Sequence, residues 1–203
     1  MQNNHSMMSR RRFAAGFALG SVALALPFPV WALNVEQARA LIDKAIGEIN
    51  TTIASGKTED AMFGDFERIF ARYADVAVIA RSALGVAAKS ASSAQMSAFT
   101  KAFQGYISRK YGRRFREFIG GKIEVVDAKA VKSFYEVITV ATLKGESPFD
   151  LRWHVSDKSG KNLFFNIIIE GINMLASERA EIGAILDKRK GDIDALIADL
   201  KAI

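Results

Sequence analysis

The period of the hydrophobic residues changes at Gly120-Gly121, and this change constrains the fold more than any other feature of the chain. Before it, apolar residues recur at three- and four-residue spacing, which is typical of amphipathic helices. After it, apolar and polar residues alternate, which is typical of half-buried strands. The alternation predicts four strands, at residues 123–128, 134–143, 151–156 and 163–169. Short turn-rich links between them favour an antiparallel meander over parallel crossovers, so we expect an α+β fold.

The helical segments carry local start and stop signals. Asn34 is placed as an N-cap, with Gln37 at the capping-box position of a helix that runs to Ile53. Asp75 is placed to cap a short helix that stops at Gly85. Further helices are expected at residues 59–73, from about residue 92 onward, at 175–190 and at 193–201.

The composition excludes several classes of site. The chain of 203 residues has no cysteine, so disulfides, thiolate metal sites and cysteine nucleophiles are excluded. Its two histidines, His5 and His154, leave little room for zinc or for histidine-based catalysis. We therefore expect neither a metal site nor a catalytic cofactor.

Residues 1–32 have the organisation of an export signal. Three arginines within Ser9–Phe13 precede a long uncharged run, and Val30-Trp31-Ala32 has the small residues of a cleavage site. The twin arginine favours the Tat route over the Sec route. An uncleaved anchor is the alternative, because the uncharged run is about as long as a bilayer requires. We expect cleavage near Leu33, a single domain over residues 33–203, and a location in the periplasm of a Gram-negative bacterium.

Basic residues are concentrated in the segment Arg109–Arg116, where five of eight residues are Lys or Arg. Nucleic-acid binding is one interpretation, since aromatic residues are interleaved with the charges. Removal of residues 1–32 would halve the net charge of +6, however, and this argues against a nucleic-acid binder. The alternatives are a solvated helix end, or contact with an anionic membrane surface, a lipid head group or an acidic partner.

Fourteen phenylalanines are many for a chain of this length. They fall mainly in the helices before the sheet and in or beside the strands. One interpretation is an ordinary filled core. The other is that helices and a curved sheet enclose an apolar cavity, and periodicity alone does not separate the two.

His154 alternates with Leu151 and Trp153, so we expect it on the opposite, wet face of the sheet. Asp150 and Asp157 lie near it in sequence, which leaves an exported hydrolase with a Ser-His-Asp arrangement as an alternative. The chain has no G-x-S-x-G motif to support that alternative.

Several segments, taken in order, resemble the MlaC or toluene-tolerance family. Asp75–Gly85 is similar to the family pattern D-x3-I-A-x3-L-G, and Phe99–Phe103 is similar to an F-x3-F helix. Ile169–Asn173 is similar to I-E-G-v-S, and Glu178–Ile182 to y-R-x-x-f. Gly191–Leu200 is similar to the ending G-x-d-x-L-I-x-x-L. The resemblance covers essentially the whole chain after residue 32. There are two departures: Leu163–Ile167 replaces a W-K-v-x-D-v strand, and Asn173 replaces a serine. Both are compatible with a divergent subgroup.

The resemblance implies helices packed on a twisted four-stranded antiparallel sheet that encloses an apolar lipid cavity. It implies a non-enzymatic periplasmic carrier that binds phospholipid as cargo. Its partners would be an inner-membrane ABC transporter complex and an outer-membrane lipoprotein complex, and its role the maintenance of outer-membrane lipid asymmetry. A related branch is associated with hopanoids, so a hopanoid-associated carrier is the alternative.

The helical stripes and one face of the predicted strands give the candidate lipid-binding residues. They are Phe66, Phe70, Phe99, Phe103, Tyr106, Ile107, Phe118, Val137, Leu151, Trp153, Phe165 and Ile167. The candidates for contact with a partner or head group are Arg109, Lys110, Arg113 and Arg114. We expect that replacing these four with serine weakens partner binding and leaves the melting temperature almost unchanged.

Overall fold

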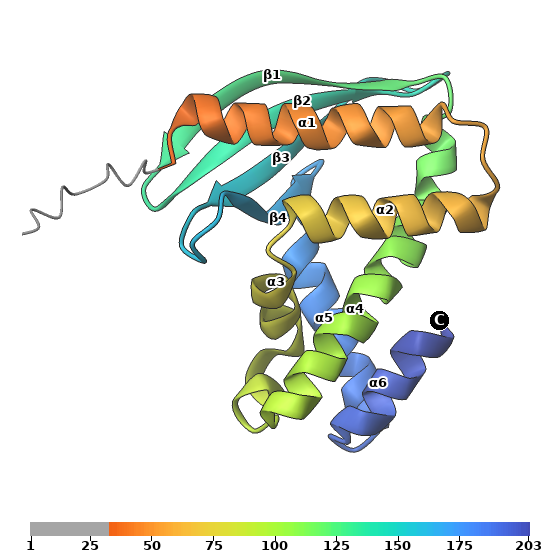
Figure 1. Cartoon of the computed structure of the whole chain (residues 1–203), viewed down its shortest axis with the longest axis vertical. Helices are drawn as coiled ribbons and strands as arrows, with labels where there is room; N and C mark the ends of the chain where they lie inside the picture. The colour runs from red at the N-terminus through yellow and green to blue at the C-terminus, as the bar shows by residue number, and fades with distance from the viewer. Residues whose placement is uncertain (1–32) are drawn as a thin grey trace, which may run out of the picture. The chain divides into compact units, whose positions relative to one another are not determined.

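The computed structural model describes residues 33–203, so the predicted signal at residues 1–32 lies outside the described residues. Within these described residues, six α-helices and five strands form the fold, with a short 3-10 helix after α3 and another after α4 (Figure 1). The helices are α1 Val35–Ile53, α2 Glu59–Tyr73, α3 Val76–Leu84, α4 Ser93–Arg114, α5 Met174–Lys188 and α6 Ile193–Ala202. The strands are β1 Lys122–Val131, β2 Phe134–Thr142, β3 Phe149–Ser156, β4 Leu163–Ile169 and β5 Ile172–Asn173.

The predicted helix caps are confirmed. The Asn34 side chain accepts a hydrogen bond from the backbone N–H of Gln37 at 2.8 Å, and the Gln37 side chain accepts one from the N–H of Asn34 at 3.1 Å. The Asp75 side chain accepts from the N–H of Val78. Gly85 ends α3 with a φ of +65°, a conformation that glycine adopts without steric penalty.

The strands form one antiparallel sheet in the order β1-β2-β3-β4-β5, which confirms the α+β class and the meander. The strands differ from the prediction in some of their bounds and in their number. The third strand begins at Phe149, before the predicted start at residue 151. The first strand continues to Val131, beyond the predicted end at residue 128. The edge strand β5 has only two residues, too few for an alternating pattern to be visible in the sequence.

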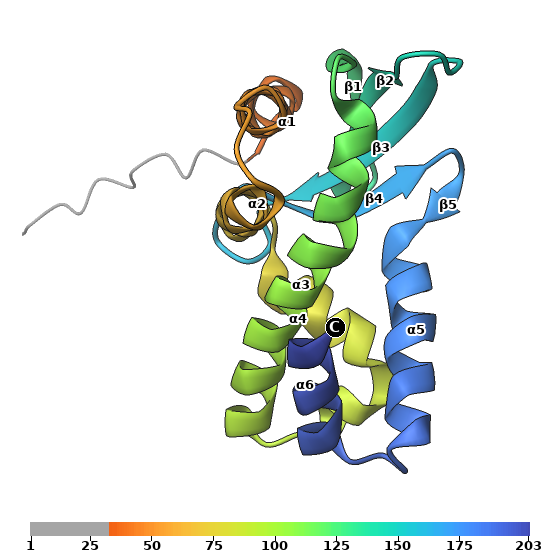
Figure 2. The same cartoon turned by 90° about the vertical axis from the view of Figure 1, so that its right-hand side faces the viewer.

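The helices divide between the sheet and a second layer. Helix α1 lies across one face of the sheet against β1, β2 and β3, and α2 lies beside α1 (Figure 1). Helices α3, α4, α5 and α6 pack against one another beyond the sheet, and only the C-terminal half of α4 rises to the level of the strands (Figure 2). Among residues 33–203, no helix is both long and apolar enough to cross a membrane.

One face of α4 is buried among other helices. Phe99 and Phe103 have no exposed surface, and Tyr106 is almost fully buried. Their rings follow one another at centroid distances of 5.7 and 6.1 Å. On the facing helices, Ile182 and Leu196 are also fully buried. These residues fill a helical core, in keeping with the first interpretation of the phenylalanines.

Candidate functional site

A cavity of about 670 Å³ lies between the helices and the sheet. Its wall is formed by α1 and α2, by the second half of α4, by β3 and β4, and by the start of α5. Most of the wall is apolar, and the volume falls within the range of roughly 300–1,000 Å³ that is usual for ligand pockets. The second interpretation of the phenylalanines, a lined cavity, therefore applies to this part of the chain.

Seven of the twelve predicted lining residues lie in the wall of this cavity. They come from α2, α4, the short helix after α4, β3 and β4, and are Phe66, Phe70, Ile107, Phe118, Leu151, Trp153 and Ile167. Trp153 is anchored by its indole N–H, which donates to the hydroxyl of Thr139 at 3.0 Å. The indole ring packs edge-on against Phe164 at a centroid distance of 5.2 Å.

Four of the other predicted lining residues are placed elsewhere by the packing. Phe99 and Phe103 belong to the helical core, because a helix of 22 residues is about 33 Å long and only its second half reaches the cavity. Tyr106 lies in the second half but is not in the cavity wall, and its hydroxyl donates to Glu181 on α5. Val137 is fully buried in β2, beside Trp153 in the register, at the part of the sheet that α1 covers. These four side chains are buried, but they pack against other elements and do not line the cavity.

Phe165 is displaced by a β-bulge. Val155 pairs with Phe164 and His154 pairs with Asn166, so Phe165 is an extra residue in β4. The bulge puts Phe164 in the cavity wall and leaves Phe165 against the rings of Phe134 and His154, outside the wall. Simple alternation from Ile167 therefore predicts the wrong side for Phe165.

Wall residues that the sequence analysis missed come mainly from strand ends and from the start of α5. They are apolar side chains next to turns, such as Phe149, Phe164, Ile169, Met174 and Leu175. Phe149 packs edge-on against Phe118 at 6.3 Å. The sequence shows that Phe149 and Phe164 lie in or beside strands, but it does not show which element each of them faces.

Polar residues in the wall fall into two groups. Those at the mouth of the cavity are exposed, and they are Arg114, Glu117, Glu146, Ser147 and Glu170. Those inside it are buried, and they are Ser108, Asn166 and Glu178. An apolar chain can therefore lie inside while a polar group stays near water.

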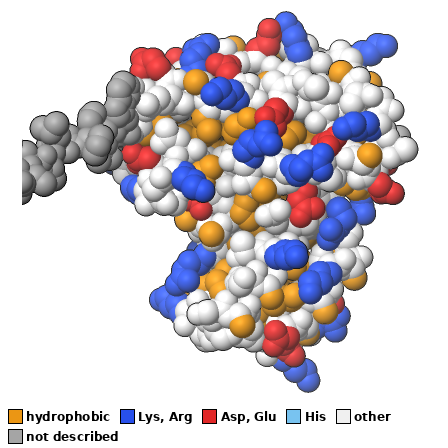
Figure 3. Space-filling model, viewed as in Figure 1, with side chains coloured by type: hydrophobic (Ala, Val, Ile, Leu, Met, Phe, Trp, Pro, Cys, Tyr) orange, Lys and Arg blue, Asp and Glu red, His pale blue; other side chains and the backbone are white. Residues whose placement is uncertain are grey.

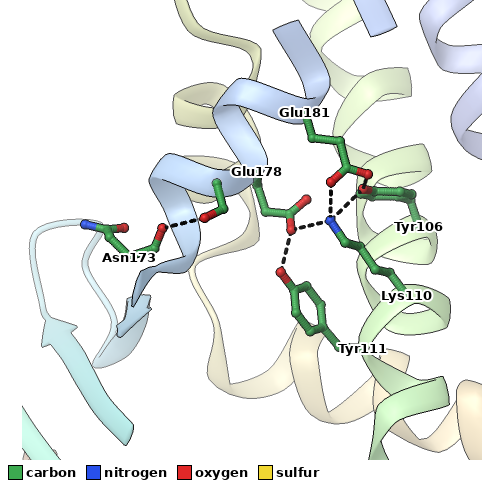
Figure 4. Close-up of polar contacts among 7 residues, drawn as sticks. Tyr106, Lys110, Tyr111, Asn173, Glu178 and Glu181 are labelled. Carbon is green, nitrogen blue, oxygen red and sulfur yellow. Dashed lines mark hydrogen bonds and ion pairs between the residues drawn. The ribbon is translucent and has the colours of Figure 1, made fainter. Parts of the chain in front are cut away.

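One partly buried cluster ties α4 to α5 (Figure 4). It is here called the Lys110 hub and consists of Tyr106, Lys110, Tyr111, Glu178 and Glu181. The ammonium of Lys110 donates to Glu178 at 2.8 Å and also to Glu181 and to the hydroxyl of Tyr106. The hydroxyls of Tyr106 and Tyr111 donate to Glu181 and Glu178 respectively. The Glu178 side chain is only 4% exposed, against 30% for Lys110 and 46% for Glu181.

The hub holds Lys110, Glu181 and the two tyrosines in fixed protonation states. Burial lowers the pKa of Lys110, but its bonds to Glu178 and Glu181 outweigh burial and raise that pKa above its ordinary value. Burial raises the pKa of Glu181, but hydrogen bonds from Lys110 and Tyr106 outweigh it and lower that pKa. Burial and the adjacent carboxylates raise the pKa of Tyr106 and Tyr111 far above the usual range, so both keep their O–H.

The four predicted contact residues do different things. Arg109 donates to the carbonyl of Leu200 at 2.8 Å and so holds α6, and Lys110 is the centre of the hub. Arg113 and Arg114 are exposed, and of these only Arg114 lies in the cavity wall. The expectation that all four could be replaced with little loss of stability is therefore wrong for Arg109 and Lys110.

A second hollow, on the outside of α1 and α2, is polar. It is lined by Lys44, Lys57, Arg68 and Arg72 together with Glu48 and Asp65. Figure 3 shows basic and acidic side chains interspersed on this face. Lys57 and Arg68 pair with Asp65, and Arg72 pairs with Glu48, so this hollow is a network of surface ion pairs rather than an apolar site.

Comparison with known proteins agrees with this geometry. The profile of the MlaC protein family matches residues 39–202. The chain belongs to the MlaC family. A solved structure of the phospholipid-binding protein from Ralstonia solanacearum, in complex with a phospholipid, has the same fold, with a TM-score of 0.70. The two sequences are 18% identical, and the match covers 81% of this chain and 95% of that chain.

In this MlaC-family chain, His154 lies away from the cavity wall. Its ring is half-buried, 4.5 Å from the ring of Phe134, and its nearest carboxylate is Glu136 at 3.5 Å. Burial lowers the pKa of His154, and the attraction of Glu136 only partly offsets this effect. Asp150 pairs instead with Arg152, and Asp157 accepts from the N–H of Leu33. The face is thus more covered than expected, and neither aspartate orients the histidine.

Within residues 33–203, no cluster of three His, Asp or Glu side chains is arranged to hold a metal ion.

Proposed function

We propose that this protein is a lipid carrier whose cavity takes the acyl chains of a phospholipid. The observation that carries the proposal is the apolar cavity between the sheet and the helices, whose mouth alone is lined with exposed polar residues. Membership of the MlaC family and the phospholipid complex of the Ralstonia protein support it. On this proposal the protein binds and hands over lipid without chemical turnover, as a non-enzyme with phospholipid as cargo and no catalytic cofactor.

The energetics of burial determine how such a carrier works. Each methylene that leaves water contributes roughly 0.8 kcal/mol, so a chain of about 16 carbons gains roughly 12 kcal/mol. Spontaneous release into water is correspondingly slow. Cargo therefore passes to the next site while the carrier is docked against it.

We further propose where the docking takes place. The sequence of residues 1–32 supports export to the periplasm by a cleaved signal, with Tat favoured over Sec. The proposed partners are an inner-membrane ABC transporter complex and an outer-membrane lipoprotein complex, and the proposed role is maintenance of outer-membrane lipid asymmetry. Arg114, exposed in the cavity wall, and its exposed neighbour Arg113 are the proposed residues for contact with a partner or a head group.

Mass spectrometry of the purified protein, native and after organic extraction, tests the proposal. A bound phospholipid of fixed stoichiometry is the expected result. A hopanoid in the extract would keep the architecture and change the cargo. Repeated preparations from membrane-containing cells without any lipid would contradict the carrier function.

A matched pair of variants in β4 connects the bound lipid to the cavity. Ile167→Trp puts a large side chain into the wall and should reduce the amount of bound lipid. Phe165→Trp, two residues away in the same strand and outside the wall, should not. Equal lipid content in the two variants would show that the lipid lies elsewhere.

A further inference from the structure

A third hollow, of about 550 Å³, lies in the helical layer beyond the sheet. It is formed by α3, the short helix that follows it and the first half of α4 (Figure 2). Small or flexible side chains line it, among them the buried Ala88 and the half-buried Ala91, Met96 and Thr100. It shares no residue with the apolar cavity, whose wall includes α4 only from Ile107 onward. The hollow is therefore a separate surface of the protein.

The charge of this surface has one sign. Residues 76–104 contain three basic side chains, Arg81, Lys89 and Lys101, and no Asp or Glu. All three are exposed, and Arg81 and Lys101 line the hollow. Within the described part of the chain, none of the three has an ion-pair partner. In the hollow on α1 and α2, by contrast, acids of the chain itself pair with most of the cations. The charge on α3 and α4 is thus left for a molecule from outside.

Large apolar side chains are exposed on the same elements. Val78 on α3 is 42% exposed, and Val86 in the short helix after α3 is 73% exposed. Val78 precedes Arg81 by three residues, a spacing at which side chains are neighbours on a helix. Figure 3 shows hydrophobic side chains among basic ones over the helices below the sheet. Exposed apolar surface beside polar groups is typical of an interaction site.

The shape of the surface favours a protein over a membrane as the acidic partner. A membrane surface is flat on the scale of this hollow, so it would reach the rim and leave the inside empty. A protein segment can enter a groove between two helices and place apolar side chains against its lining. Its carboxylates then meet the guanidinium of Arg81 and the ammonium of Lys101. Complementary charges of this kind steer the encounter and fix the orientation of the partner.

We propose that the hollow between α3 and α4 docks an acidic segment of a partner protein, whose carboxylates pair with Arg81 and Lys101 and whose apolar side chains lie against the hollow and Val78. Lys101 and Arg114 are 13 residues apart on α4, which is about 20 Å along the helix axis. Docking in this hollow therefore leaves the exposed polar mouth of the cavity free for the cargo.

The absence of cysteine from the chain provides a direct test. Ser97→Cys places a single thiol in the hollow, and Ser159→Cys places one in the exposed turn between β3 and β4 as a control. Each purified protein is labelled with a benzophenone maleimide, mixed with the cell-envelope fraction of its own organism and illuminated. We expect an adduct from Ser97→Cys and not from Ser159→Cys. Mass spectrometry of the digested adduct should place it on a segment of another protein that is rich in Asp and Glu.

Charge reversal connects the adduct to the two cations. Arg81→Glu/Lys101→Glu, made in the Ser97→Cys protein, should lower the adduct yield about tenfold, because two attractive contacts become repulsive. Lys158→Glu/Lys161→Glu is the matched control, since it reverses two exposed lysines in the β3–β4 turn, and it should leave the yield unchanged. Both double variants should keep the melting temperature and the lipid content of the parent protein.

The possible results are distinct. An adduct yield from Ser97→Cys no higher than that from Ser159→Cys would overturn the docking surface, as would a yield that survives the reversal of Arg81 and Lys101. An adduct with lipid, with a second copy of this chain or with a segment that has no excess of acid would overturn the acidic protein partner. Each of these results leaves the carrier function standing, because the lipid content of the cavity is measured independently.

Discussion

The Lys110 hub makes a sharp prediction about stability. Lys110→Met keeps most of the aliphatic stem but removes the ammonium that compensates Glu178. The Glu178 carboxylate, only 4% exposed, then retains one hydrogen bond, from Tyr111, and no counter-charge. Glu181 also loses its cation, but it is 46% exposed and water can replace the lost bond.

The size of the effect follows from this asymmetry. Breaking a buried ion pair by removing one partner destabilises a protein by about 3–5 kcal/mol, and the 30% exposure of Lys110 places this case near 3 kcal/mol. Glu181→Gln, which disrupts the exposed pair, should change stability by about 0–1 kcal/mol. The double variant Lys110→Met/Glu178→Gln removes the uncompensated charge and should recover at least half of the loss.

Urea denaturation measures these differences. With a slope of about 2 kcal/mol/M, Lys110→Met should lower the unfolding midpoint by about 1.5 M. The melting temperature should fall by roughly 6–12 °C for a domain of this size. The reasoning is refuted if Lys110→Met shifts the midpoint no more than Glu181→Gln, or if the double variant is less stable than Lys110→Met alone.

Three further predictions test other parts of the structure. The pKa of His154 is lowered in the folded protein, so the unfolded chain binds more protons than the folded one as the pH falls. The melting temperature should therefore fall as the pH drops from 7.5 to 5, and His154→Gln should make this fall smaller. Gly112→Ala places a Cβ 2.6 Å from the ring of Phe63 and should cost about 1–3 kcal/mol in urea denaturation; an unchanged midpoint would show that α2 moves freely. Arg113→Ser/Arg114→Ser should weaken binding to the membrane complexes without a change in melting temperature, and unchanged affinity would argue against this surface.

Features that depend on neighbours in sequence were predictable. Asn34 and Gln37 form their capping box within four residues, and Asp75 caps α3 in the same way. The strands could be found because alternation is a local property, and their order follows from short links. These predictions needed no knowledge of what each element packs against.

Features that depend on distant partners were not predictable. Lys110 belongs to a basic run in the sequence. Nothing near it in the sequence shows that it will bond to Glu178 and Glu181, some 70 residues later. Phe165 is on the opposite side from Ile167 because of one bulge, and a shift of one residue exchanges the two faces of a strand. The stripe from Phe99 to Ile107 is apolar throughout, although its first part packs on helices and its last part lines the cavity.

The position of the Lys110 hub explains how a cavity can exist in a stable fold. Apolar side chains that face an open space have fewer van der Waals contacts there, so the cavity surface itself contributes little to holding its walls in place. Helix α5 supplies part of the wall and must be held from outside it. The contact with α3, the edge pairing of β4 with β5 and the ion pairs from Lys110 supply these contacts. Because Glu178 belongs both to the hub and to the wall, a residue that holds α5 in place is itself part of the cavity.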